Sequence, residues 1–123
     1  MQIKDICDAI KGLNDKNKIV VGQEYETGRI INGKKEYAKM FEVESLPNAA
    51  GNIDINTKLS NITVTKLEGK IYGTTIVSNI PFIYTAQPSV YHYFSPTTNR
   101  IIIRVTDNMS SYSATETLYY TKN

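Results

Sequence analysis

The sequence predicts an all-β protein, an antiparallel β-sandwich of jelly-roll type preceded by a short N-terminal α-helix. Two observations indicate the sheets: from Ile19 onward apolar residues follow the two-residue period of strands, and turn-forming residues interrupt them about every 8 to 12 positions. Before Ile19 the period is instead that of a helix. The 123 residues therefore divide into residues 1–18, a helix with a hinge, and residues 19–123, the β-sandwich domain.

The helix is expected over residues 3–14. Its apolar residues repeat at the spacing of a coiled-coil seam and are Ile3, Ile6, Ile10 and Leu13. The polar turn formers of residues 14–18 end it. Because so short a helix is marginal alone in water, its apolar stripe must lie against something. It packs either on its own domain or on copies of itself around a symmetry axis, where isoleucine at both seam positions favours trimers or higher states.

A hairpin is expected over residues 25–40, because Asn32-Gly33 between two extended runs is typical of a two-residue type I′ turn. The turn predicts five cross-strand pairs: Ile31 with Lys34, Ile30 with Lys35, Arg29 with Glu36, Gly28 with Tyr37, and Glu26 with Lys39. Since most of these side chains are polar, we expect a largely solvated edge or arm, with Ile30 or Tyr37 touching the sandwich or a neighbour.

The core is expected from later strands in which apolar and polar residues alternate. The inward faces are predicted to be Ile62 and Val64; Ile101, Ile103 and Val105; and Tyr112, Ala114, Leu118 and Tyr120.

Tyrosines gather where charges are scarce. Residues 71–123 hold seven of the nine tyrosines but, of all charged residues, only Arg100, Arg104, Asp107, Glu116 and Lys122. A surface rich in tyrosine and neutral polar groups suits contact, either subunit packing or glycan binding. Tyr91, Tyr93 and Tyr119 are the candidate sugar-stacking rings.

The composition argues against several classes of partner. The net charge is +2, which favours neither nucleic acid nor an anionic membrane. No apolar run is long enough for a membrane helix, and residues 1–5 do not resemble a secretion signal, so we expect synthesis as a soluble cytoplasmic product. The single cysteine, Cys7, excludes an intrachain disulfide and is expected to be a small buried hydrophobe.

Catalysis finds little support in the sequence. The single histidine, His92, is expected to be a half-exposed strand residue, and no second histidine or nearby cysteine completes a metal-binding spacing. A nucleophile elbow, a phosphate loop and an EF-hand are absent. We therefore predict no catalytic, metal-binding or cofactor-binding residues and no enzyme. An enzyme would become credible only if His92 met an acid and a nucleophile in one cleft.

Several segments together carry a family resemblance. They are Tyr25 and Gly28, "RIINGKKEYAKMF" at 29–41, "LPN" at 46–48, "SNIPFI" at 78–83, "NRIIIRV" at 99–105 and "DNMSSYSATETLYYTK" at 107–122. Residues 23–122 resemble a β-sandwich module of phage and prophage virion proteins from Gram-positive bacteria, often the C-terminal part of tail, baseplate or fibre proteins. Members typically carry a Gly-x-Trp-Ile-Asp-Gly-Lys-x-Ile-Tyr hairpin and a Ser-Ala-x-x-x-Leu-x-Tyr-Thr-Lys-like final strand.

This chain departs from that pattern at four positions. It has Ile30 in place of an aromatic residue, Asn32 in place of Asp, and Glu36 and Glu116 in place of apolar residues. An inward carboxylate at 116 would cost several kcal/mol unless it is paired. We therefore expect Glu116 near a sheet rim or paired with Arg104 or Arg100.

The resemblance implies a virion structural protein without enzymatic activity, commonly a homotrimer displayed at the particle surface. It favours a helix that trimerises the chain or docks it to other virion proteins, of the capsid or of the tail and baseplate. A chain that starts at Met1 is expected to borrow its attachment from such a partner, as a capsid decoration, head fibre or baseplate accessory. The alternative is an adhesin that binds a host cell-surface glycan.

Overall fold

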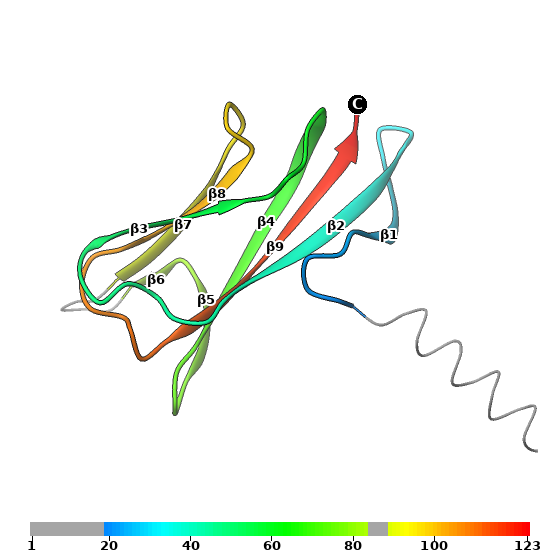
Figure 1. Cartoon of the computed structure of the whole chain (residues 1–123). Coiled ribbons are helices and arrows are strands. Elements are labelled where there is room, and N and C mark those ends of the chain that lie inside the picture. Colours follow the sequence, from blue (N-terminus) through cyan, green and yellow to red (C-terminus); the bar gives the residue numbers. More distant parts are fainter. Residues whose placement is uncertain (1–18, 84–88) are drawn as a thin grey trace, which may run out of the picture.

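The computed structural model describes residues 19–83 and 89–123, and this part of the chain forms nine strands in two antiparallel sheets (Figure 1). The five-stranded sheet contains, in spatial order, β1 (Tyr25–Ile31), β2 (Lys34–Val43), β9 (Ser113–Lys122), β4 (Ile62–Tyr72) and β5 (Val77–Ile80). The four-stranded sheet contains β3 (Gly51–Asn56), β8 (Arg100–Val105), β7 (Ser89–Ser95) and β6 (Phe82–Ile83). The all-β prediction is confirmed. The expected helix, with Ile3, Ile6, Ile10 and Leu13, lies outside the described residues.

The chain changes sheet four times: after β2, β3, β5 and β8. The last strand, β9, then enters the middle of the five-stranded sheet and pairs with β2 on one side and β4 on the other. In Figure 1 the two sheets approach each other near β5 and β6 and spread apart toward the turns that join β1 to β2 and β7 to β8. Because the last strand, β9, lies between two earlier strands, its side chains decide much of the packing.

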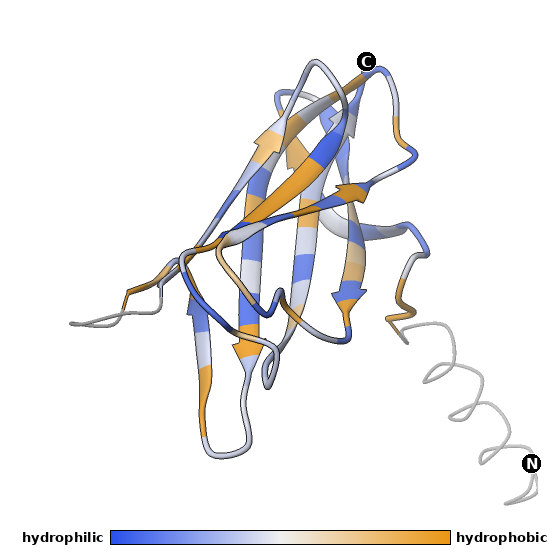
Figure 2. Cartoon of the chain, turned by 60° about the vertical axis from the view of Figure 1, so that its left-hand side comes forward, coloured by the Kyte–Doolittle hydropathy of each residue, from blue (hydrophilic) through white to orange (hydrophobic). Residues whose placement is uncertain are grey.

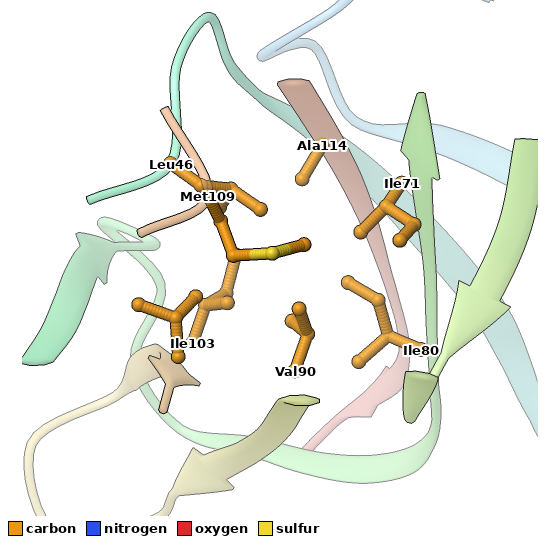
Figure 3. Close-up of a cluster of buried hydrophobic side chains, with 8 residues drawn as sticks. Leu46, Ile71, Ile80, Val90, Ile103, Met109 and Ala114 are labelled. Carbon is orange, nitrogen blue, oxygen red and sulfur yellow. The ribbon is translucent and has the colours of Figure 1, made fainter. Parts of the chain in front are cut away.

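The facing sides of the two sheets share two clusters of buried apolar side chains. In the first, Met109 extends between residues of both sheets, as Figure 3 shows; its other members are Leu46, Ile71, Ile80, Val90, Ile103, Val105 and Ala114. The second contains Phe41, Ile101, Leu118 and Tyr120. Burial of this apolar surface provides the main driving force for folding.

The predicted alternation is present in the core strands and appears as hydrophobic and hydrophilic bands in Figure 2. Ile101, Ile103 and Val105 of β8 are at most 1% exposed, and Ala114, Leu118 and Tyr120 of β9 are fully buried. The alternation of apolar and polar residues in the sequence thus identified the inward faces of β8 and β9.

The hairpin turn forms as predicted. Asn32 and Gly33 have φ angles of 50° and 78°, the two positive values that a type I′ turn requires. Ile31 pairs with Lys34 and Ile30 with Lys35. Turn chemistry therefore fixed the register next to the turn.

Farther from the turn the predicted register is wrong. Three residues of β1, residues 27–29, lie opposite Glu36 alone, so that Tyr37 faces Glu26 instead of Gly28. Gly28 has a φ of 86° within this bulge, a conformation that glycine adopts without strain. The side chain of Glu26 consequently forms an ion pair with Lys35, with Lys35 Nζ 3.5 Å from Glu26 Oε1, and not with Lys39.

The expectation of a mostly solvated hairpin holds for β1 but is wrong for β2. Ile30 is 63% exposed, whereas Glu36, Ala38 and Phe41 of β2 are buried. The reason is position: β1 is the sheet edge, while β2 lies between β1 and β9. Tyr37 contacts the core as expected, because its ring stacks on Tyr120 with centroids 6.2 Å apart.

Candidate binding surfaces and an interior histidine–glutamate contact

The first candidate surface is the outer face of the four-stranded sheet. Tyr91 and Tyr93 of β7 point away from the core, and their side chains are 41% and 54% exposed. Across the sheet, Tyr91 lies opposite Arg104, and Tyr93 lies opposite Ile102. Two tyrosine rings two residues apart on one strand face form an exposed aromatic strip.

Polar side chains of β3 continue this face. Asn52 lies opposite Arg104, and Asp54 lies opposite Ile102. Ile102 is only 7% exposed although it points outward. The strip therefore combines two rings, a covered apolar centre and a border of charged and amide groups, which is the composition of a contact surface.

Tyr119, the third ring predicted from the sequence, is not part of this strip. It lies on β9, on the outer face of the five-stranded sheet, opposite Ala38 of β2 and Lys66 of β4. The structure thus brings Tyr91 and Tyr93 together but places Tyr119 on the opposite side of the protein. Tyr119 instead shares a shallow hollow with Tyr25 and Tyr72.

Tyr119 is held by a small polar network. Its hydroxyl donates a hydrogen bond to Glu68 Oε2 at 3.2 Å, and Lys66 pairs with Glu68 while its Nζ lies 5.4 Å from the Tyr119 ring centroid. Burial, together with the negative charge of Glu68, raises the pKa of Tyr119 to about 12. Hydrogen bonding from Lys66, joined by that from Tyr119, lowers the pKa of Glu68. At neutral pH the tyrosine therefore stays a donor and the glutamate a carboxylate.

A hydrogen-bonded histidine and glutamate join the two sheets inside the protein. His92 of β7 and Glu116 of β9 both point inward, and His92 Nδ1 lies 2.9 Å from Glu116 Oε1 and 2.8 Å from Oε2. The Glu116 side chain is 0% exposed and that of His92 12%. Burial raises the pKa of Glu116, and the hydrogen bond and charge of His92 oppose that rise.

The pair lies between the two apolar clusters along both strands. Val90 and Ala114 precede it and belong to the first cluster, while Phe94 and Leu118 follow it and pack in the second. Gly69 of β4 makes room for the carboxylate, since a Cβ at this position would lie 2.7 Å from Glu116 Oε1. The site is a buried cross-sheet contact and not a cleft.

Two predictions about these residues are wrong. Glu116 is fully buried and does not pair with Arg104 or Arg100, because both arginines alternate with the inward residues of β8 and so belong to its outward face. His92 is not half-exposed but turned inward. The alternation of β7 and β9 contained the signal, because it placed both residues on core-facing positions.

Glu36, the other departure from the resemblance, is also buried and bonded. Its side chain is 1% exposed and accepts hydrogen bonds of 2.9 Å from Thr27 and from Thr65, with Arg29 Nη1 at 3.7 Å. Thr27 belongs to the bulge of β1, and Thr65 to a second bulge in β4. The two irregularities therefore aim hydroxyls at one carboxylate.

Glu24 ties the start of the described chain to its end. It accepts hydrogen bonds from the Tyr120 hydroxyl and, at 2.8 Å, from Lys122 Nζ. Burial raises the pKa of Glu24, but these two hydrogen bonds together lower it by more, so the pKa of Glu24 lies below its ordinary value. Lys122 Nζ also lies 4.2 Å from the centroid of the Tyr37 ring.

Within residues 19–83 and 89–123, no three histidine, cysteine, aspartate or glutamate side chains gather as metal ligands would. In the same residues no helix is long and apolar enough to cross a membrane. The exposed groups of these surfaces can stack on other rings through tyrosine, form hydrogen bonds and contribute both signs of charge.

Comparison with known proteins finds no matching family model, and neither the curated proteins nor the solved structures contain a significant match.

Proposed function

We propose that this chain is a structural accessory protein of a bacteriophage particle, a surface-displayed and trimeric component of the head or of the tail and baseplate. The proposal includes a jelly-roll-like β-sandwich, a short N-terminal helix, and residence in the virion after synthesis in the host cytoplasm. Ile3, Ile6, Ile10 and Leu13 hold subunits together or anchor them to other virion proteins. The chain has no enzymatic role, and nucleic acid and membrane insertion play no part.

The observation that carries this proposal is the resemblance to virion modules, because its segments supply interior strands of the five-stranded sheet and buried residues of the core. The hairpin provides β1 and β2, and the final segment provides β9 between β2 and β4. Leu46 of the "LPN" segment is buried, and the carbonyl of Pro47 accepts a hydrogen bond from the Met109 amide. A resemblance at residues that build the sheet and the core supports a shared fold, because these residues determine which structure the sequence adopts.

The start of the described chain supports an attachment at this end. Ile19, Val20 and Val21 are 50%, 44% and 48% exposed, so three consecutive apolar residues meet solvent. They directly follow the segment that carries the apolar stripe. Exposed apolar patches are typical of surfaces that another protein covers.

Light scattering on the full chain tests the trimer. Ile6→Asp together with Ile10→Asp places charges in the seam, and we expect the trimer to dissociate; Lys11→Glu, outside the apolar repeat, is the matched control and should leave it intact. A monomeric wild-type chain at all concentrations would contradict the trimer. Electron microscopy of intact particles tests the location, and absence of the protein from them would contradict the virion role itself.

A second function, glycan binding by an adhesin, is favoured by the exposed strip of Tyr91 and Tyr93. Rigid rings beside amide and charged groups offer stacking and directed hydrogen bonds at small entropic cost. A glycan array that remains blank for the intact oligomer would eliminate this second function.

A further inference from the structure

The five-stranded sheet carries a hollow of about 210 Å³ on its outer face, opposite the side that faces the core. Its lining residues come from the first described residue and from four strands, β1, β2, β4 and β9: Ile19, Tyr25, Met40, Glu68, Lys70, Tyr72, Thr115, Thr117 and Tyr119. Tyr91 and Tyr93 have no part in it, since they belong to the other sheet.

The hollow exists because short side chains lie between long ones. Thr117 of β9 stands opposite Met40 of β2 and Glu68 of β4, and Thr115 stands opposite Lys70. Two threonines on the central strand thus form a low floor between taller neighbours. Tyr119 lies two residues beyond Thr117, while Tyr72 lies opposite Ser113, so rings close the hollow at both ends.

The groups around the floor are arranged in advance of any ligand. Tyr119 is oriented by its hydrogen bond to Glu68, and the Tyr72 hydroxyl lies 3.3 Å from Thr115 Oγ1. Glu68 supplies a carboxylate acceptor and Lys70 an ammonium donor, so opposite charges balance across the hollow. Within the described part of the chain, Lys70 has no ion-pair partner closer than the 4 Å of a salt bridge.

We propose that this hollow binds one ring of a neutral saccharide, with one face of the sugar against Tyr72 and its hydroxyls toward Glu68, Lys70 and the two threonines. Balanced charge disfavours a strongly anionic or cationic ligand. The volume is below the roughly 300 Å³ at which pockets for drug-sized ligands begin, which fits a single sugar unit of a longer chain. This site deepens the glycan-binding candidate and rests on it for the class of ligand, but it lies on a different face.

An NMR titration of the full chain tests the site. The probes are N-acetylglucosamine, glucose and galactose, each added singly into the millimolar range, where weak single-ring binding is detected. We expect the amide resonances of Thr115, Thr117 and Tyr72 to shift, and those of Tyr91 and Tyr93 to stay. If no probe shifts any resonance, or if the shifts fall only on β7, the inference is wrong.

Two variants and one control separate this site from the strip on the other sheet. Tyr72→Ala removes the ring of a residue that is 36% exposed, and Thr115→Leu fills part of the hollow with a larger side chain. Each variant should bind the probes at least tenfold more weakly, while its circular dichroism spectrum and melting temperature stay close to those of the wild type. The control Tyr91→Ala, at a residue that is 41% exposed, should bind the probes as wild type does. Unchanged binding in both hollow variants overturns the site. Electron microscopy of intact particles tests the virion role separately, so failure of the saccharide site and failure of the virion role can be told apart.

Discussion

Replacing His92 by leucine is the most direct test of the interior pair. Leucine fills most of the space of the imidazole, so the variant removes the partner of Glu116 without opening a large cavity. The carboxylate is 0% exposed, and His92 Nδ1 is the group within hydrogen-bond distance of both its oxygens. Removing one member of a buried pair costs about 3–5 kcal/mol, so we expect the free energy of unfolding at pH 7 to fall by about that amount.

The loss should depend on pH in a defined direction. Burial raises the folded-state pKa of Glu116 and His92 opposes this rise, so His92→Leu leaves burial to raise it further. A group whose pKa is raised in the folded state contributes to stability when it is protonated. This contribution is complete below the unfolded pKa of 4.5 and is lost as pH rises through the folded-state pKa. The destabilisation by His92→Leu should therefore shrink as pH falls toward 4.5.

Urea unfolding followed by circular dichroism at a series of pH values measures this effect. Glu116→Gln is the matched variant: it keeps the shape and removes the ionisable group, so His92→Leu in its background should lose the pH dependence that comes from Glu116. A loss below about 1 kcal/mol at pH 7, or one that does not shrink on acidification, would refute a buried charge held by His92.

Three further variants probe other contacts of the fold. Gly69→Ala brings a Cβ to 2.7 Å from Glu116 Oε1 and should cost about 1–3 kcal/mol in urea unfolding; Glu116→Ala in the same chain should relieve the clash, and an unchanged midpoint for Gly69→Ala would contradict it. Thr65→Val removes a hydrogen bond to Glu36 and should lower the free energy of unfolding by about 1.5–3 kcal/mol. The control is Thr63→Val, whose partner Asn123 is exposed, and it should change the free energy of unfolding by no more than about 0.5 kcal/mol. Equal losses in the two variants would show that Glu36 does not use the Thr65 hydroxyl. Glu24→Gln should lower the melting temperature at pH 7 but not well below pH 4.5, because a lowered pKa stabilises the fold above the unfolded value and this is lost as pH falls; a pH-independent difference would argue against ionised Glu24.

Local chemistry predicted the parts of the fold that depend on few residues. Asn32 and Gly33 specified their turn, and the alternation of β8 and β9 identified the buried faces, because both signals are written in neighbouring residues. The bulge at Gly28 broke the predicted register, since it depends on what faces β1 across the sheet. A glycine in a strand was the available sign of it.

The binding surfaces were predicted less well, because they depend on which sheet each strand joins. Tyr91, Tyr93 and Tyr119 share an outward alternation, yet β7 and β9 belong to different sheets. Tyr25 and Tyr72, which join Tyr119 around the hollow, were not chosen as candidates. Their positions follow from the pairing of β1 with β2 and of β4 with β9, which no short segment specifies.

Among the described residues, the two carboxylates that depart from the resemblance are the two most buried ones, and each is held by a residue far along the chain. Glu36 is 29 positions from Thr65, and Glu116 is 24 from His92. Strands rich in threonine and valine tolerate register slips, because a shifted partner looks much the same. A slip by two residues, which keeps each side chain on its own face of the sheet, would separate either carboxylate from its partners and leave a buried charge unpaired, at a cost of several kcal/mol. We therefore expect Glu36 and Glu116 to contribute more to the choice of register than to net stability. If so, replacing His92 and Glu116 together by leucine should preserve stability while broadening the NMR spectrum through alternative pairings of β9.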